Sequence, residues 1–180
     1  MYLAVDVQYR DDPKEPGQTI GHVAGVLFET LQSKEPVHTL AFDYMGVADY
    51  EPGAFYKREL PCILTLLHML DIVNNPYNIE CIFVDSFVDL HDHAGLGRHL
   101  YTDLYVALGR ETQVIGVAKT AFQGAQAVEV VRGVSSKKPL YVQAAGMLNL
   151  EAAEMVKSLD GENRIPTMLK LVDTLARTVS

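Results

Sequence analysis

Long apolar runs are missing from this chain of 180 residues. No run approaches the roughly 18 apolar residues that a membrane-spanning helix needs, and residues 1–6 reach an aspartate too early for a secretory signal peptide. Internal repeats and low-complexity segments are also lacking. With 48% hydrophobic and 21% charged residues, the composition is that of an ordinary globular protein. We therefore expect one compact domain over residues 1–180, cytoplasmic and without a membrane partner; the sequence leaves its oligomeric state open.

Cysteine and basic residues are scarce as well. The two cysteines, Cys62 and Cys81, fall in a predicted helix and a predicted strand, so buried free thiols are expected rather than a disulfide or a metal pair. Lysine and arginine number 15 against 23 acidic residues, and the net charge is −8. This balance argues against a protein that holds nucleic acid by bulk electrostatics. It is compatible with a nuclease, because a bound cation offsets acids gathered around it.

The order of apolar segments predicts a mixed α/β protein. Three strands with short connections come first and form an antiparallel meander, at about residues 3–9, 22–30 and 37–44. Helices and strands then alternate: a helix with an apolar stripe over 63–70, strands at 79–85 and 112–119 around a helix at 94–108, a strand at 140–144, and helices at 150–159 and 167–178. Because helical crossovers join parallel strands, the later strands are expected to run parallel to the central strands of the sheet. We expect a ribonuclease-H-like mixed sheet of five or six strands, flanked by helices.

The segment from Tyr50 to Pro61 carries the most distinctive local pattern. Pro52-Gly53 predicts a tight turn, because proline fixes φ at about −65° and glycine accepts positive φ, and this turn would display Tyr50 on a loop. Pro61 is expected in the first turn of the following helix, where its missing N–H costs nothing. Glu59 would then lie at the positive end of that helix. A loop aromatic and a carboxylate stabilised by the helix dipole are thus expected near each other.

Three carboxylates converge in this predicted arrangement. Asp6 interrupts the first strand, Asp85 ends the fourth, and Glu59 begins the helix between them. In mixed α/β sheets sites gather beyond strand ends, so adjacent strands would place Asp6 and Asp85 side by side. Each acid alone has an ordinary structural explanation, as a cap or an acceptor of backbone hydrogen bonds. Together they would repel one another without a cation, and Mg²⁺ prefers such oxygen ligands, so we favour a metal site.

Lys119 and the histidines are the remaining candidates for chemistry. Lys119 follows an otherwise apolar strand, where a lysine can neutralise a neighbouring carboxylate or a scissile phosphate. His91, Asp92 and His93 match no closed zinc pattern, so solvated or hydrogen-bonded side chains are expected there. His99 lies on the predicted second helix next to its apolar stripe, and a polar or half-buried role is expected for it.

These motifs resemble those of endonuclease V, a metal-dependent family of the ribonuclease-H-like fold that cuts nucleic acid one bond 3′ of inosine. The resemblance covers most of the chain, in order and with nearly the family's spacing. The residues that carry it are Val5-Asp6-Val7, Tyr50-x-Pro52-Gly53 with Arg58-Glu59, Phe83-Val84-Asp85 followed by His91, Gly95-Leu96-Gly97-Arg98-His99-Leu100, Gly116-Val117-Ala118-Lys119 and Arg164-Ile165-Pro166. The block from Tyr50 to Glu59 is its most specific part.

The resemblance implies an endonuclease that acts on DNA or RNA with Mg²⁺ or Mn²⁺ as cofactor. The residues that match the family's metal-binding carboxylates are Asp6, Glu59 and Asp85. The residues that match other polar groups of its active site are His91 and Lys119. The residues matched to substrate binding are Tyr50, Pro52, Gly53 and Arg58. In this interpretation metal ions activate a water and stabilise the leaving oxygen, and the Tyr50 ring separates the strands while the extruded base is read in a pocket.

The chain also departs from the family pattern. Ser86-Phe87-Val88 stand where the family has Gly-His-Gly, and glycines there let the backbone approach the lesion base. Ala145-Gly146 stand where the family has a late histidine near the metal, and the stretch after His91 is one residue short. We therefore expect weaker discrimination of inosine from adenine. A paralogue that binds metal or nucleic acid without cutting is the alternative; a purely structural protein is disfavoured because the three carboxylates and Lys119 are retained.

Overall fold

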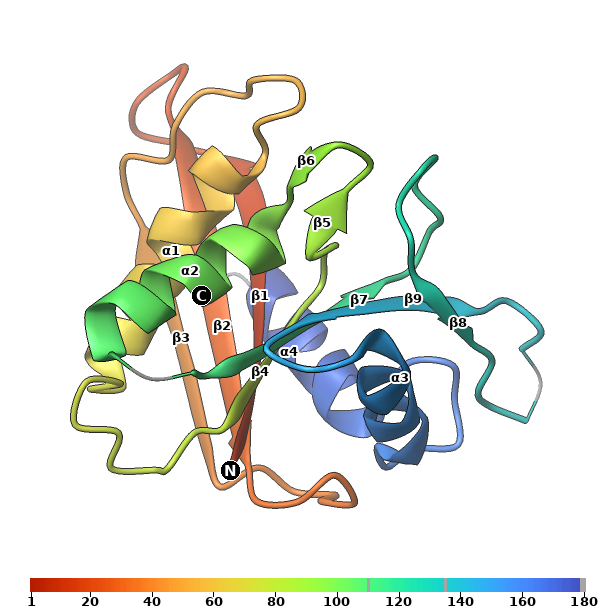
Figure 1. Cartoon of the computed structure of the whole chain (residues 1–180). Helices are drawn as coiled ribbons and strands as arrows, with labels where there is room; N and C mark the ends of the chain where they lie inside the picture. The colour runs from red at the N-terminus through yellow and green to blue at the C-terminus, as the bar shows by residue number, and fades with distance from the viewer. Residues whose placement is uncertain (110, 135, 179–180) are drawn as a thin grey trace.

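The computed structural model describes residues 1–109, 111–134 and 136–178 (Figure 1). Three antiparallel strands open the chain, β1 (Tyr2–Asp11), β2 (Thr19–Phe28) and β3 (His38–Tyr44). The remaining elements are α1 (Tyr56–Met69), β4 (Cys81–Val84), β5 (Asp89–Leu90), β6 (His93–Ala94), α2 (Leu96–Leu108), β7 (Gln113–Ala118), β8 (Val128–Val130), β9 (Leu140–Ala145), α3 (Asn149–Ser158) and α4 (Thr167–Arg177). The element order therefore follows the sequence prediction, with three short strands added.

One mixed sheet has the strand order β3-β2-β1-β4-β7-β9-β8. β4 pairs in parallel with β1 and with β7, and the connections between them contain α1 and α2, as crossovers between parallel strands require. The ribonuclease-H-like mixed sheet expected from the sequence is confirmed. The sheet has seven strands instead of five or six, because the edge strand β8 has only three residues and too few apolar positions to stand out as a run.

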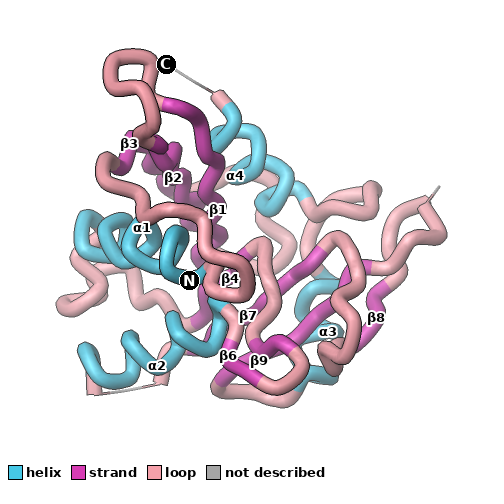
Figure 2. The backbone as a smooth tube through the Cα atoms, turned by 90° about the horizontal axis from the view of Figure 1, so that it is seen from above, coloured by secondary structure: helices cyan, strands magenta, loops and turns pink. Residues whose placement is uncertain are grey.

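Helices cover both faces of the sheet, as the view from above shows (Figure 2). Side chains alternate along β1, so Ala4 contributes to the apolar cluster with α3 and α4, while Leu3 and Val5 contribute to the cluster with α1 and α2. Strands that are buried on both faces read as nearly continuous apolar runs. This explains why a carboxylate such as Asp6, in the middle of β1, stands out in the sequence.

The prediction that Pro61 occupies the first turn of α1 is wrong, because the helix begins earlier. The turn at Pro52-Gly53 leads directly into helical hydrogen bonds, from the N–H of Lys57 to Ala54 and from that of Arg58 to Phe55. Pro61 therefore lies inside α1, where the ring removes one backbone donor. Glu59 keeps its predicted place in the first turn, and it is buried.

Other expectations from the sequence are met. Both cysteines are buried free thiols. α2 ends at Gly109, which takes the left-handed conformation with φ 62°. His99 is half-buried, and its ring stacks on Tyr56 with centroids 3.7 Å apart. Among the described helices, none has the length and apolar character to cross a bilayer.

Candidate metal centre

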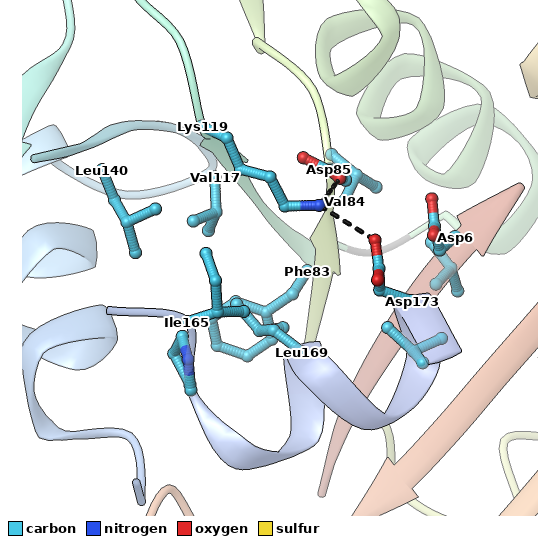
Figure 3. Close-up of a pocket in the computed structure, with 13 residues that line it drawn as sticks. Asp6, Phe83, Val84, Asp85, Val117, Lys119, Leu140, Ile165, Leu169 and Asp173 are labelled. Carbon is cyan, nitrogen blue, oxygen red and sulfur yellow. Dashed lines mark hydrogen bonds and ion pairs between the residues drawn. The ribbon is translucent and has the colours of Figure 1, made fainter. Parts of the chain in front are cut away.

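Neighbouring parallel strands place two of the predicted carboxylates next to each other. Val5 of β1 lies opposite Val84 of β4, so the residues that follow, Asp6 and Asp85, are side by side at the edge where β4 ends. The expectation that adjacent strands bring these two acids together is confirmed. Lys119 directly follows β7 on the other side of β4, and its side chain reaches the same place (Figure 3).

A third carboxylate, Asp173, comes from α4 and was missed in the sequence. Asp6, Asp85 and Asp173 each offer an oxygen, and these oxygens lie within 4.8 Å of one another; we call these three residues the carboxylate cluster. α4 packs its apolar stripe, including Val172 and Ala176, against the sheet, which carries Asp173 to the end of β4. Its sequence signal was weak: one acid beside the apolar stripe of the last helix.

Cations compensate the cluster unevenly. Lys119 Nζ lies 2.5 Å from Asp85 Oδ2 and 3.1 Å from Asp173 Oδ1 (Figure 3). Asp173 also pairs with Arg177 at 3.1 Å and with Lys170 at 3.3 Å. Hydrogen bonds from Arg177, and then from Lys119 and Lys170, hold the pKa of Asp173 well below its ordinary value although the side chain is buried. Asp173 is therefore ionised at neutral pH.

Asp6 has less compensation. One of its oxygens accepts the N–H of Val7 at 2.9 Å, and the other accepts a hydrogen bond from Gln8 at 3.2 Å. Burial raises the pKa of Asp6, and the charges of Asp85 and Asp173 raise it further, against the opposing effects of Gln8 and Lys119. A cation beside Asp6 would remove this conflict.

Glu59 approaches the cluster from α1 without joining it. Its side chain is buried, and burial raises its pKa well above the ordinary value, with smaller contributions from the charges of Asp6 and Asp85. Its oxygens are outside the group that shares the 4.8 Å separation. The structure thus brings Asp6 and Asp85 together and adds Asp173 to them. Glu59 lies close enough for the charges of Asp6 and Asp85 to raise its pKa.

The donor set fits a hard divalent cation. Lys119, Lys170 and Arg177 compensate Asp85 and Asp173, whereas Asp6 has no cation among the described ion pairs. Carboxylate oxygens are the ligands that Mg²⁺ prefers. Beside the cluster lies a cavity of about 20 Å³, room for about one water molecule or ion. Apolar side chains from the sheet, from α4 and from the segment just before α4 line its other sides (Figure 3), among them Val5, Phe83, Val117, Leu140, Ile165, Leu169 and Val172. A nucleotide is too large for this space.

The predicted substrate-binding segment forms an exposed loop. Pro52-Gly53 makes the expected turn, with Gly53 at φ 80° and a 3.0 Å hydrogen bond from the N–H of Ala54 to Glu51. Tyr50 is 65% exposed, as expected for a displayed ring. The guanidinium of Arg58 stacks over the ring of Tyr9, 4.5 Å from its centroid. Tyr50 and the turn are thus free to meet a ligand, while Arg58 is held against the protein.

A hollow of about 390 Å³ lies between this turn and the segment after Asp85. We call it the aromatic hollow; its lining residues are Gly53, Phe55, Tyr56, Ser86, Leu90, His93, Gly95, Leu96 and Phe122. Of the three residues that replace the family's Gly-His-Gly, only Ser86 lines it. Phe87 and Val88 are buried, so neither side chain narrows the approach to the hollow.

His91 and Gly146 lie away from the carboxylate cluster. His91 is exposed and lines a separate polar hollow of about 410 Å³ with Asp89, Gly124 and Gln126. Gly146 lies against Tyr101 and Gln113, at the opposite end of β7 from Lys119. The expectation that Ala145-Gly146 marks a histidine lost from the metal site is therefore wrong, since the place beside the acids is taken by Asp173.

Comparison with known proteins supports the fold. No family model matches the chain, and no curated protein matches it. Solved structures match over nearly its whole length: Ciona intestinalis endonuclease V in complex with a 24mer DNA containing an inosine followed by a ribo-adenosine (TM-score 0.71, 18% identity, 98% of this chain and 83% of that one) and human ENDOV (0.68, 21%, 98% and 82%). A protein of unknown function from Archaeoglobus fulgidus also matches (0.56, 15%, 97% and 95%). The resemblance inferred from the motifs is thus confirmed for the fold.

Proposed function

We propose that this protein is a metal-dependent endonuclease that hydrolyses a phosphodiester bond in DNA or RNA, 3′ of an inosine or another structurally perturbed base. The observation that carries the proposal is the carboxylate cluster with Lys119 beside it, at the strand ends of a sheet shared with endonuclease V structures. The inosine-containing DNA bound to the Ciona protein supports a nucleic acid as the substrate class.

The chain offers a set of ligands for Mg²⁺ or Mn²⁺. Asp6, Asp85 and Asp173 would hold the ion, and Glu59 is a further candidate ligand because its buried carboxyl group feels the charges of the first two. Such an ion supplies an activated water and stabilises the leaving oxygen in phosphodiester hydrolysis. Lys119 adds a fixed positive charge that can neutralise the scissile phosphate.

Other residues hold the substrate strand. Tyr50 is proposed to fill the place of an extruded base, since its exposed ring lies on the loop before the Pro52-Gly53 turn. The aromatic hollow is proposed to receive that base, because Gly53 lines it and aromatic faces stack on any base. His91 is proposed to contact the same strand from the polar hollow, which shares Leu90 with the aromatic one.

The second candidate function is binding of metal or nucleic acid without cutting. Ser86 favours it, because its side chain occupies the wall of the aromatic hollow where the family keeps a glycine. A wild-type protein that binds strands but cleaves none of them would point to this function.

One assay tests the proposal. Matched DNA and RNA strands that differ only in one inosine or adenine are incubated with the protein and Mg²⁺, Mn²⁺ or a chelator. We expect cleavage that needs the metal and is abolished by Asp85→Asn. Asp103→Asn, on the exposed surface of α2, is the matched control and should cleave as wild type does. Undiminished cleavage by Asp85→Asn would overturn the mechanism.

A further inference from the structure

Gln143 of β9 is a buried polar residue that binds two loops at once. Only 5% of it is exposed. Its Oε1 accepts hydrogen bonds from the N–H groups of Val88 and Asp89, both at 3.0 Å, and its Nε2 donates to the carbonyl of Gln126 at 2.9 Å. Two donors on one side and an acceptor on the other fix the orientation of the amide. No apolar or charged side chain of this size satisfies all three partners.

Residues at the start of α2 form hydrogen bonds to the other side of the segment 86–89. The carbonyl of Val88 accepts the N–H groups of Gly95 at 2.9 Å and Arg98 at 3.1 Å. The Arg98 side chain also forms two hydrogen bonds to the carboxylate of Asp89, at 3.0 and 2.6 Å. The segment is therefore held through its carbonyls by α2 and through its N–H groups by Gln143.

A glycine in the sheet leaves room for the backbone of this segment. Gly116 lies opposite Gln143 in the pairing of β7 with β9. A Cβ atom at Gly116 would lie 2.4 Å from the carbonyl oxygen of Ser86, which is closer than any side chain allows. The backbone thus rests directly on β7 at Gly116, and the neighbouring Gln143 supplies the hydrogen bonds that keep it there.

Both loops bound by Gln143 carry walls of the aromatic hollow. Ser86 and Leu90 flank the residues that its Oε1 holds, and Phe122 lies four residues before Gln126 in the loop after Lys119. The two loops also contact each other, because the rings of Phe87 and Phe122 pack with their centroids 6.1 Å apart. Gln143 therefore ties together two walls of the hollow without lining it.

We propose that Gln143 is a positioning residue that sets the shape of the aromatic hollow and thereby its selectivity between bases. The inference rests on the proposed function, in which this hollow receives the extruded base. Where the family has Gly-His-Gly, this chain has Ser86, Phe87 and Val88, and the buried amide of Gln143 constrains the backbone that they form. Selectivity in this protein then depends on a residue of β9 outside the hollow.

The test uses two substitutions at Gln143. Gln143→Met keeps the volume and removes all three hydrogen bonds, so Val88 and Asp89 should lose hydrogen-exchange protection. Gln143→Glu keeps an acceptor for both N–H groups and should restore part of that protection. Thr112→Val is the matched control, because it removes another buried polar group, just before β7 and at the opposite end of that strand from Lys119.

Selectivity is measured as the ratio of kcat/KM for inosine-containing over adenine-containing strands. We expect Gln143→Met to lower this ratio about tenfold or more through KM and kcat together, with Mn²⁺ binding by the free protein unchanged, and Gln143→Glu to recover part of it. A folded Gln143→Met protein with wild-type selectivity would overturn the inference, as would wild-type protection of Val88 and Asp89.

If Gln143→Met does not fold, Gln143→Glu decides. A Gln143→Glu protein that keeps both the wild-type exchange protection and the wild-type selectivity supports the inference. A Gln143→Glu protein that keeps the protection but loses the selectivity contradicts it. If the wild-type protein neither binds nor cleaves the strands, the proposed function fails, whereas the exchange measurement still decides whether Gln143 positions the loops.

Discussion

Lys119 and Asp173 form an ion pair across 54 residues of chain, with Nζ and Oδ1 3.1 Å apart. The same ammonium lies 2.5 Å from Asp85, so a strand end and the last helix meet at one lysine. Burial lowers the pKa of Lys119, but the hydrogen bonds and charges of Asp85 and Asp173 outweigh it and hold the pKa above its usual value. Lys119 therefore stays charged and offsets part of the negative charge that would attract a divalent cation.

Replacing Lys119 should separate metal binding from catalysis. Lys119→Met leaves Asp85 with no other cation among its described ion pairs, so we expect tighter Mn²⁺ binding by calorimetry. Cleavage should nevertheless fall about 100-fold or more, because a fixed charge at the phosphate is lost. Lys170→Met is the control, since Lys170 also pairs with Asp173 but is 64% exposed. Weaker Mn²⁺ binding by Lys119→Met would show that the lysine positions the acids rather than competing with the ion.

Asp173 should behave as a metal ligand although it comes from the last helix. In Asp173→Asn we expect Mn²⁺ affinity and cleavage to fall about 100-fold, because one of the three converging carboxylates is gone. Glu154→Gln, at an exposed position of α3, should change neither. Wild-type Mn²⁺ affinity in Asp173→Asn would leave Asp173 only the role of ordering Lys119 and Arg177.

The sequence predicted the part of this site that lies on the sheet and missed the part that depends on packing. Asp6 and Asp85 interrupt or end apolar strands, and the parallel crossover through α1 makes those strands neighbours. Asp173 carries no such signal, because its place depends on how α4 packs across β1 and β2. The role of Gln143 could not be predicted from the sequence either, since its hydrogen-bond partners are backbone groups 17 to 55 residues away.

Local rules also failed where tertiary structure overrode them. Pro61 was assigned to the start of α1 from its missing N–H, yet the turn at Pro52-Gly53 starts the helix at Tyr56. The loss of one backbone hydrogen bond is tolerated because Ile63, Leu66 and other residues of the same helix are fully buried against the sheet. Capping preferences therefore located the helix but not its first residue.

Tyr50 should contribute to substrate binding and not to stability. Tyr50→Ala is expected to weaken binding of an inosine-containing strand by about 1–3 kcal/mol, the range for an aromatic that stacks on a base. The Tm should remain that of the wild type, because the ring is 65% exposed. Tyr105→Ala, at a 52% exposed position of α2, is the matched control for both measurements. Equal affinities for Tyr50→Ala and Tyr105→Ala would exclude the strand-separating role.

Glu59 should lower stability at neutral pH in the absence of a metal. Its folded-state pKa is raised, first by burial and then by Asp6 and Asp85, well above the ordinary 4.5. The folded protein therefore holds the proton more tightly than the unfolded chain, and stability falls as pH rises from about 4.5 through the folded-state pKa. Glu59→Gln has no proton to lose, so it should be more stable than the wild type above this range and similar to it at lower pH.

Thermal unfolding of Glu59→Gln from pH 4 to pH 8, with and without Mn²⁺, tests this expectation. The variant should gain about 2–4 °C in Tm at pH 8 for each kcal/mol of stability recovered, and the gain should vanish toward pH 4. If Glu59 is also a metal ligand, excess Mn²⁺ should raise the Tm of the wild type more than that of the variant, because only the ionised carboxylate binds. Glu129→Gln, at an exposed position of β8, controls for the change of charge. A variant that is less stable than the wild type at every pH would mean that Glu59 is ionised and fully compensated in the folded protein.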